Sequence, residues 1–359
     1  MIHPVIMAGG KGERFWPYSN SRHPKQLLPL VTRQSMLEDT LDHVKRLSRQ
    51  ATTRLIIGKN LEKPVKTKLK GRRGVEIVAE PMSKNTAAAI ALACRIIQAQ
   101  DPQGVMIVLT ADHAIGPAAD FQKALKAAVE VAQKRRSLVT FGIKPTRPDV
   151  GFGYVEAQEG QSEVQGLAVH AVKRFHEKPT PEKAREYVES GRFFWNSGMF
   201  AWRVDVLWEQ FEKHQPDLAK AFVKAGELNP KSKLFADKVK KLYAKLPDLS
   251  IDYGIMEKAD RIEVIIPEIH WDDIGSWSAL DRLHRADAAG NRALGENVLL
   301  DTENCTVFAD QGLVCTYGVK DLLVVQHEGV TLVIPKDRLP QIKNLVKLVQ
   351  SKSKLSKYL

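Results

Sequence analysis

The alternation of short apolar runs with stretches of helical periodicity constrains the fold of this chain more than any other feature of its sequence. The runs "VIM", "RLIIG", "VEIVAE", "VMIVL" and "SLVTFGI" are almost continuously apolar, as strands buried on both faces are. Helical patterns such as "NTAAAIALACRIIQAQ" and "DFQKALKAAVEVAQKR" lie between some of them. This order predicts an α/β fold with a mostly parallel, doubly wound sheet that helices cover on both faces.

One predicted helix has a clear beginning. In "SMLEDTLDHVKRL", Ser35 lies three residues before Glu38, which is the spacing of a capping box. The apolar residues that follow recur on one face of a helix. The segment that starts at "VIM" is therefore predicted to run from a strand through a glycine-rich loop into a helix.

The pattern changes near Gly290, within the connector "RADAAGNRALGEN". Short predicted strands without helices follow, in "VLLD", "CTVFAD", "GLVCTYGV", "DLLVVQHEG" and "VTLVIPKD". An amphipathic helix from about Asp337 to Gln350 closes the chain. We therefore predict two domains, a large α/β domain over residues 1–288 and a small β-rich domain with a C-terminal helix over residues 289–359.

Composition excludes several classes of protein. With 359 residues and 43% hydrophobic residues, the chain is expected to be globular with a substantial core. No apolar stretch reaches the roughly 20 residues of a membrane span, and the first residues do not form a signal peptide. We expect a cytoplasmic protein without a membrane partner. The cysteines Cys94, Cys305 and Cys315 form no C-x-x-C pair and are expected to be reduced, buried and inert.

The net charge of +12 favours anionic partners. Basic residues are dispersed along the chain except in the tail "KSKLSKYL", and no basic stripe interleaved with aromatic residues is present. Nucleotides therefore fit the charge better than nucleic acid, which is not an expected partner.

The loop "AGGKGERFWPYS" directly follows the strand "VIM". It does not match the Walker A pattern, and the third glycine of the dinucleotide-binding fingerprint is replaced by Phe15. Its glycines still allow backbone N–H groups to approach a phosphate closely, and Arg14 and Lys25 supply matching charge. Taken by itself, the loop fits a phosphate cradle and a simple tight turn about equally well.

The longer string "AGGKGERFWPYSNSRHPKQLLPL" resembles the G-x-G-x-R-x-x-P…P-K signature of the sugar-nucleotide pyrophosphorylases, a family of nucleotidyltransferases. Further strings resemble the bacterial mannose-1-phosphate guanylyltransferases, or GDP-mannose pyrophosphorylases, in the same order along essentially the whole chain: "AEPMSKNTAAAIALA", "VLTADHAI", "GFGYVE", "FHEKP", "FWNSGMFAW", "SIDYGIMEK", "WDDIGSW" and "GENVLLDTENCTVFAD". The resemblance implies a Rossmann-like nucleotide-diphospho-sugar transferase domain followed by a short left-handed β-helix. Many relatives continue into an isomerase domain. This chain resembles the short form, so isomerase activity is not expected.

The resemblance also implies a reaction. An oxygen of the phosphate of α-D-mannose 1-phosphate attacks the α-phosphorus of GTP in line, and pyrophosphate leaves. No covalent intermediate with the enzyme is expected. Because the attacking phosphate is already an anion, such a transfer depends on positioning and charge neutralisation more than on acid–base chemistry.

Residue roles follow from the resemblance, position by position. Arg14 is expected to neutralise the β- and γ-phosphates, Lys25 to contact the α-phosphate, and Glu80 to accept hydrogen bonds from the guanine edge. The full set implied to bind the nucleotide is Ala8, Gly9, Gly10, Lys11, Gly12, Glu80, Asn85 and Thr86. The set implied to bind the sugar phosphate is Gly153, Glu177, Lys178 and Asn196.

The implied cofactor is Mg²⁺, held by Asp112 and Asp273. These two residues, with Arg14 and Lys25, are the expected catalytic set. The doublet Asp272–Asp273 is ambiguous from sequence, but neighbouring side chains of a strand point to opposite faces, so only one should reach the metal. The nearby His113 is expected to be structural.

Two alternatives stay open. The chain fits a pyrophosphorylase for another sugar 1-phosphate or nucleoside triphosphate, because the glycine loop is widely shared. It also fits a non-catalytic regulatory homologue, although such a protein is expected to have lost a loop cation or a metal carboxylate. Because the stacked strands of a β-helix leave exposed ends, the tail is expected to be an assembly or packing module of a homodimer or higher homo-oligomer rather than part of a second active site.

Overall fold

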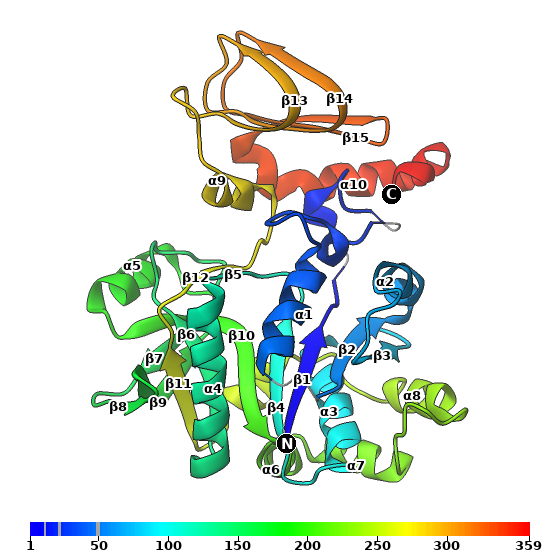
Figure 1. The fold of residues 1–359 in the computed structure, drawn as a ribbon, viewed down its shortest axis with the longest axis vertical. Helices are drawn as coiled ribbons and strands as arrows, with labels where there is room; N and C mark the ends of the chain where they lie inside the picture. Colours follow the sequence, from blue (N-terminus) through cyan, green and yellow to red (C-terminus); the bar gives the residue numbers. More distant parts are fainter. Residues whose placement is uncertain (11, 21–22, 48–50) are drawn as a thin grey trace. The chain divides into compact units, whose positions relative to one another are not determined.

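The computed structural model describes residues 1–10, 12–20, 23–47 and 51–359. The chain forms two compact units (Figure 1). Unit 1 consists of Met1–Gly9, Thr40–Ala111 and Ile115–Trp271, and unit 2 of Gly10–Asp39, Asp112–Ala114 and Asp272–Leu359. Each unit is thus assembled from three separate segments of the chain. In the prediction from sequence, by contrast, each domain is one continuous segment, with the boundary after residue 288.

Unit 1 contains a mixed sheet with the strand order β3-β2-β1-β4-β10-β6-β11-β9-β7, and β8 pairs with β9. Strands β3, β2, β1 and β4 are parallel, as predicted, and so are β6 and β11. Strand β10, however, is antiparallel to both β4 and β6. The α/β class is confirmed, and the sheet as a whole is mixed, because a continuous apolar run reports burial of a strand and not its direction. The strands are β1 (Ile2–Met7), β2 (Thr53–Gly58), β3 (Val75–Glu80), β4 (Val105–Thr110), β6 (Leu138–Ile143), β7 (Tyr154–Ala157), β8 (Ser162–Val164), β9 (Leu167–His176), β10 (Phe193–Arg203) and β11 (Ile262–Ile266).

Helices α3 and α4 both pack on this sheet. Helix α3 packs on β1, β2 and β4. Buried residues lie around nearly the whole circumference of this helix, as its apolar composition predicts. Helix α4 packs on β4, β6, β10 and β11. The α-helices in the described part of the chain are α1 (Met36–Leu47), α2 (Glu62–Lys68), α3 (Asn85–Gln98), α4 (Ala118–Arg135), α5 (Pro181–Ser190), α6 (Val204–His214), α7 (Pro216–Ala225), α8 (Phe235–Tyr243), α9 (Leu280–Leu283) and α10 (Ile342–Ser351).

The predicted capping box of α1 is confirmed. The Ser35 N–H donates to Glu38 Oε2 at 3.0 Å, and the Glu38 N–H donates to Ser35 Oγ at 3.4 Å. The two residues therefore satisfy each other's backbone donors at the start of the helix.

Unit 2 contains a four-stranded sheet among its described residues, formed by β13 (Arg292–Leu300), β14 (Thr306–Tyr317), β15 (Leu322–His327) and β16 (Val330–Pro335). The first three strands are parallel and β16 returns antiparallel to β15. The sequence divides β14 into two strands, which is wrong: the chain passes Gly312, at φ +75°, without leaving the sheet. Strands β5 (Ala114–Gly116) and β12 (His270–Asp272) form a separate pair.

The predicted C-terminal helix is confirmed, with a 3₁₀ helix over Lys336–Gln341 ahead of α10. Pro340 lies in this 3₁₀ helix and cannot donate a backbone hydrogen bond. Helix α10 buries Ile342 and Val346 in the core of unit 2.

This core joins the tail to the segment that follows the glycine loop. Phe15 packs on Trp277 at 5.3 Å between ring centroids, and Tyr18 on Phe308 at 4.5 Å. The same cluster contains buried apolar residues of the tail, namely Leu323, Val325, Leu332, Leu339, Ile342 and Val346. The tail therefore packs against the segment that follows the glycine loop and helps to hold it in place within unit 2.

Deleting residues 290–359 is expected to give an aggregating or smaller species. The deletion uncovers Phe15, Trp16 and Trp277, and each fully buried apolar side chain contributes roughly 1.5–3 kcal/mol. Light scattering and circular dichroism measure the outcome. A well-behaved truncated protein of unchanged oligomeric size would contradict both the packing role and the assembly role of the tail.

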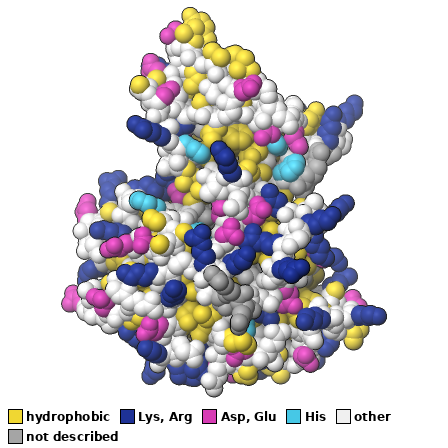
Figure 2. Space-filling view, viewed as in Figure 1, with side chains coloured by type: hydrophobic (Ala, Val, Ile, Leu, Met, Phe, Trp, Pro, Cys, Tyr) yellow, Lys and Arg dark blue, Asp and Glu magenta, His cyan; other side chains and the backbone are white. Residues whose placement is uncertain are grey.

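The surface carries scattered basic residues, and several apolar side chains of the tail are exposed. On the face drawn in Figure 2, lysine and arginine side chains are spread out rather than gathered in one stripe. Hydrophobic side chains are exposed on the strands of the tail: Val298, Leu300, Leu313, Tyr317 and Val333. None of the helices in the described parts of the chain has the length and apolar character needed to cross a membrane.

The cysteines are only partly as predicted. Cys94 and Cys305 are buried, and burial raises the pKa of the Cys94 thiol to about 12. Cys315 is exposed, which corrects the expectation that all three are buried. It lies on β14, where alternate side chains face solvent, and the apolar run around it did not reveal which face it occupies.

Candidate active site

The glycine loop begins where β1 ends. The Ala8 N–H donates to the carbonyl of Ile56 at 2.9 Å, so the backbone is still tied to β2 at this point. Gly9 follows, and Gly10 has a φ of +104°, a conformation that favours glycine. The predicted residue Lys11 lies outside the described residues.

Gly12 shapes the next part of the loop. Its φ is +63°, and a Cβ added there would lie 2.7 Å from Lys25 Cβ and would also overlap the Ser19 hydroxyl. Only glycine therefore allows the Lys25 side chain to approach the loop this closely.

A pocket of about 570 Å³ in unit 2 gathers the predicted catalytic residues. They come from three segments: the glycine loop with the 3₁₀ helix Lys25–Leu27, the end of β4, and the turn after β12. The residues that line the pocket are Gly12, Glu13, Arg14, Phe15, Lys25, Asp112, His113, Asp273, Gly275 and Lys343. The structure thus brings Arg14, Lys25, Asp112 and Asp273 together.

Lys25 is the buried cation of this pocket. Its Nζ donates to Asp112 Oδ2 at 2.8 Å and to the Asp273 carbonyl at 3.3 Å. It also lies 5.7 Å from the centre of the Phe15 ring. The Lys25 side chain is 9% exposed, whereas Arg14 is exposed at the pocket. Lys25 is therefore held in place by its neighbours, and Arg14 has the freedom to reach a ligand.

The turn after β12 separates the roles of the two neighbouring aspartates. Asp273 lines the pocket, and its Oδ1 accepts the Gly275 N–H at 3.2 Å. Asp272 is buried and accepts both nitrogens of an Arg282 fork, with Nη2 to Oδ1 at 2.8 Å. Ile274 between them and the glycine has a φ of +43°, which is costly for a β-branched residue. This turn resolves the ambiguity of the doublet in favour of Asp273 as the pocket residue.

Burial and the neighbouring Asp272 raise the pKa of the Asp273 carboxyl, and Lys25 opposes this shift. Burial also lowers the pKa of His113 to about 4, with Lys25 acting in the same direction and Asp112 against it. His113 lines the pocket, and its imidazole is neutral near pH 7. Its structural role stays a prediction.

In unit 1, the structure places Glu80 at the end of β3. The Tyr243 hydroxyl donates to Glu80 Oε1 at 3.0 Å, and burial raises the pKa of Glu80 to about 7. Asn85, at φ +62°, and Thr86 begin helix α3. The Thr86 hydroxyl accepts the Ile251 N–H at 2.8 Å, so it also secures the chain near residue 251.

The residues expected to bind the sugar phosphate also lie in unit 1, where three of them are close together. The Asn196 N–H donates to the Gly153 carbonyl at 2.8 Å, and a Cβ on Gly153 would overlap the Glu177 carboxylate. Lys178 Nζ lies 3.7 Å from Glu177 Oε1, and its side chain is 68% exposed. Burial, together with Asp252, raises the pKa of Glu177.

Two residues were missed by the sequence reasoning. Asp252 Oδ1 accepts from Asn196 Nδ2 at 2.8 Å, and burial raises the Asp252 pKa. Its signal was present in the string "SIDYGIMEK", from which no residue was singled out. Lys343 reaches the pocket from α10 and carries no signal, because it looks like any basic residue on the polar face of an amphipathic helix.

Comparison with known proteins assigns the chain to a family. Residues 3–290 match the model of the family described as nucleotidyl transferase, and residues 295–348 match the "MannoseP isomerase/GMP-like beta-helix domain". The mannose-1-phosphate guanylyltransferase of Escherichia coli is 33% identical over 348 residues, which are 96% of this chain and 74% of that protein. The alginate biosynthesis protein AlgA of Pseudomonas aeruginosa is 33% identical over 346 residues, 96% of this chain and 71% of that protein.

A solved structure agrees with these matches. It is named mannose-1-phosphate geranyltransferase, comes from Thermus thermophilus, and superposes with a TM-score of 0.86 at 33% identity. The match covers 97% of this chain and 99% of that one. With family models and relatives that together span nearly its whole length, the chain belongs to the nucleotidyl transferase family, among the mannose-1-phosphate guanylyltransferases.

Proposed function

We propose that this protein transfers the GMP group of GTP to α-D-mannose 1-phosphate, giving GDP-mannose and pyrophosphate. The observation that carries the proposal is the pocket that holds Arg14, Lys25, Asp112 and Asp273, in a chain 33% identical over almost its whole length to a named mannose-1-phosphate guanylyltransferase. The proposed substrates are cytoplasmic metabolites, so we propose a cytoplasmic location as well.

In the proposed step, a phosphate oxygen of the sugar phosphate forms a bond to the α-phosphorus of GTP. The bond from that phosphorus to the bridging oxygen of the β-phosphate breaks, and pyrophosphate leaves with the electron pair. Lys25 acts on the α-phosphate, where charge develops, and Arg14 on the departing phosphates. Both cations therefore stabilise the transition state more than the ground state. Because the attacking phosphate is already an anion, the proposed step needs no proton transfer from His113.

Mg²⁺ is part of the proposal, and the pocket fits it. Asp112 and Asp273 offer the hard oxygen ligands that Mg²⁺ prefers, usually one or two carboxylates beside substrate phosphates. The raised pKa of Asp273 indicates a carboxylate whose charge a bound cation would offset. When bound, the ion neutralises phosphate charge and helps to orient the triphosphate.

Glu80 is proposed to accept hydrogen bonds from the N1–H and 2-amino groups of guanine. Glu80→Gln should raise the KM for GTP by roughly 10- to 100-fold, because a hydrogen bond to a charged group is worth about 1.5–3 kcal/mol. ITP, which lacks the 2-amino group, should lose less affinity than GTP does. Steady-state kinetics with both nucleotides measure this, and an unchanged preference for GTP over ITP in the variant would contradict the role of Glu80.

The same role predicts a pH dependence. Burial raises the pKa of Glu80 to about 7, so the carboxylate that accepts from guanine is progressively protonated as the pH falls through about 7. The KM for GTP should therefore rise toward pH 6 in the wild type. In Glu80→Gln it should be flat over this range.

The sugar side of the proposal rests on Glu177 and Asn196 as hydroxyl-binding groups, with Gly153 leaving the space that the carboxylate occupies. Asp252 orients the Asn196 amide through its hydrogen bond and is a positioning residue. Lys178 is proposed to hold the sugar phosphate.

The test of the proposed function is a pyrophosphate-release assay over a matrix of sugar 1-phosphates and nucleoside triphosphates. We expect mannose 1-phosphate with GTP to give the highest kcat/KM. Faster turnover of another pair would favour the alternative of a pyrophosphorylase with different substrates. No turnover of any pair would favour a regulatory homologue, although Arg14, Lys25, Asp112 and Asp273 are all present.

We also propose that the protein is a homo-oligomer. The exposed apolar side chains of the tail strands, among them Leu300 and Tyr317, suit a contact between copies.

A further inference from the structure

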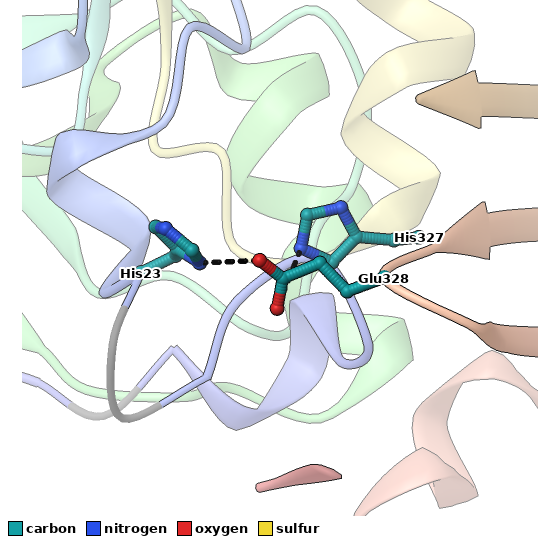
Figure 3. A group of neighbouring side chains, drawn as sticks. All are labelled: His23, His327 and Glu328. Carbon is teal, nitrogen blue, oxygen red and sulfur yellow. Dashed lines mark ion pairs between the residues drawn. The ribbon is translucent and has the colours of Figure 1, made fainter. Parts of the chain in front are cut away.

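We propose that His23, His327 and Glu328 form a binding site for one borderline transition-metal cation of the Zn²⁺ type, separate from the catalytic pocket. Figure 3 shows the three side chains directed toward one another, with His23 ahead of the 3₁₀ helix Lys25–Leu27 and the other two at the turn between β15 and β16. All three residues belong to unit 2. Their potential ligand atoms lie within 4.8 Å of one another.

The distances suit a small cation. His23 Nδ1 lies 3.7 Å from Glu328 Oε1, and His327 Nε2 lies 3.9 Å from Glu328 Oε2. Tetrahedral zinc, with bonds of about 2.0–2.2 Å, places neighbouring ligand atoms about 3.4 Å apart. The His23 and Glu328 side chains are 47% and 35% exposed, so both have room for the small movement that closes the site.

His327 shows that the site is built rather than accidental. It is 5% exposed, and its Nδ1 lies 2.8 Å from Asp310 Oδ2. Its other nitrogen, Nε2, is buried and has no hydrogen-bond partner in the described structure, although it faces Glu328. A buried imidazole nitrogen without a partner is costly, and a metal ion satisfies it.

The Asp310–His327 pair also fixes which nitrogen is available. When Nδ1 carries the ring proton, the Nδ1–H donates a hydrogen bond to the Asp310 carboxylate, and Nε2 presents its lone pair. Carboxylate–histidine–metal arrangements of this kind orient the ring and make it a better ligand. The Tyr18 ring lies edge-on to His327 at 4.9 Å between centroids and holds the imidazole from a second side.

The donor set selects the class of cation. Two imidazoles and one carboxylate suit Zn²⁺, whereas Mg²⁺ and Ca²⁺ prefer oxygen ligands. Three protein ligands leave a fourth position for solvent, and a pocket of about 430 Å³ lined by His327 and Glu328 opens beside them. The carboxylates of Asp310 and Glu328 offset the charge of a divalent ion.

The site would act as a clamp within unit 2. The bound ion would join two parts of the chain, the segment at His23, two residues before Lys25, and the β15–β16 turn. These two parts are about 300 residues apart in sequence. The ion would thus stabilise the segment that carries Lys25 without taking part in the transfer reaction. This inference does not depend on which sugar or nucleotide the protein uses.

The test uses the untagged full-length protein, treated with a chelator and returned to buffer with excess MgCl₂, so that sites with oxygen ligands hold Mg²⁺. ZnCl₂ is then titrated against a chromophoric chelator. We expect one tight equivalent per chain in the wild type, and binding at least tenfold weaker in His23→Gln and Glu328→Gln. Asp310→Asn should weaken binding by about 10- to 100-fold, as the loss of such an outer partner does. The exposed His270, replaced in His270→Gln, is the matched control and should leave binding unchanged.

Two further readouts make the result specific. Co²⁺ in place of Zn²⁺ should give the visible absorption of a tetrahedral site in the wild type and in His270→Gln, and His23→Gln should lose it. Saturating ZnCl₂ should raise the Tm of the wild type but not that of Glu328→Gln. Equal zinc affinity in the wild type, His23→Gln and Glu328→Gln would overturn the proposal, and so would a wild type that binds no tight equivalent.

Discussion

Asp273→Asn is expected to lower kcat on the order of a thousandfold, whereas Asp272→Asn should leave most of the activity and lower stability instead. Asp273 lines the catalytic pocket, and the proposed metal contact is worth several kcal/mol of transition-state stabilisation, with about 1.4 kcal/mol for each tenfold change in rate. Asp272 is occupied by Arg282. Its replacement leaves the guanidinium poorly paired, which costs about 1–3 kcal/mol of unfolding free energy.

Pyrophosphate release and thermal unfolding, measured on both variants, separate the two roles. Asp112→Asn is expected to behave like Asp273→Asn, and both should need more Mg²⁺ for half-maximal activity. If Asp272→Asn were the inactive variant and Asp273→Asn the unstable one, the metal ligand would have to be moved by one residue. Full activity in EDTA would eliminate the metal.

Lys25→Ala and Arg14→Ala are each expected to lower turnover by about a hundredfold or more, as the loss of one oriented contact to the transition state does. Lys25 is buried and bonded to Asp112, so its truncation also leaves space and an unneutralised carboxylate. Lys25→Met keeps the length of the side chain and removes only the charge, and it should lose nearly as much activity as Lys25→Ala.

The matched control for these loop variants is Lys178→Met, which also removes a lysine charge but belongs to the sugar-phosphate set. It should raise the KM for mannose 1-phosphate more than it lowers kcat. Circular dichroism should show an intact fold in every variant. Unchanged turnover in Arg14→Ala would remove the loop from the proposed mechanism.

Much of the fold could be predicted because its signals are local. Burial of β1, β4 and β6, the capping box of Ser35 and Glu38, and the amphipathic C-terminal helix are each set by residues that are close in sequence. The direction of β10 was not predicted, because apolar composition reports burial and not strand polarity. The exposure of Cys315 was missed for a similar reason.

The candidate site divides in the same way. The sequence by itself determined the family and the residue types: a glycine loop, two basic residues and acidic residues at strand ends, whose chemistry suits a nucleoside triphosphate. The resemblance favoured Asp273 over Asp272, but the residues alone left the doublet ambiguous. The different surroundings of the two side chains depend on a turn with Ile274 at positive φ and on a partner, Arg282, ten residues away.

Only the tertiary structure placed distant residues in one pocket. Lys343 on α10 lines the same cavity as Lys25, and Phe15 shares a core with Ile342 and Val346, more than 300 residues later. The contact of His23 with Glu328 likewise joins residues about 300 positions apart in sequence. Such contacts leave no local pattern, because the free energy of packing depends on which surfaces meet after folding, and side-chain periodicity specifies only that a face is buried, not what buries it.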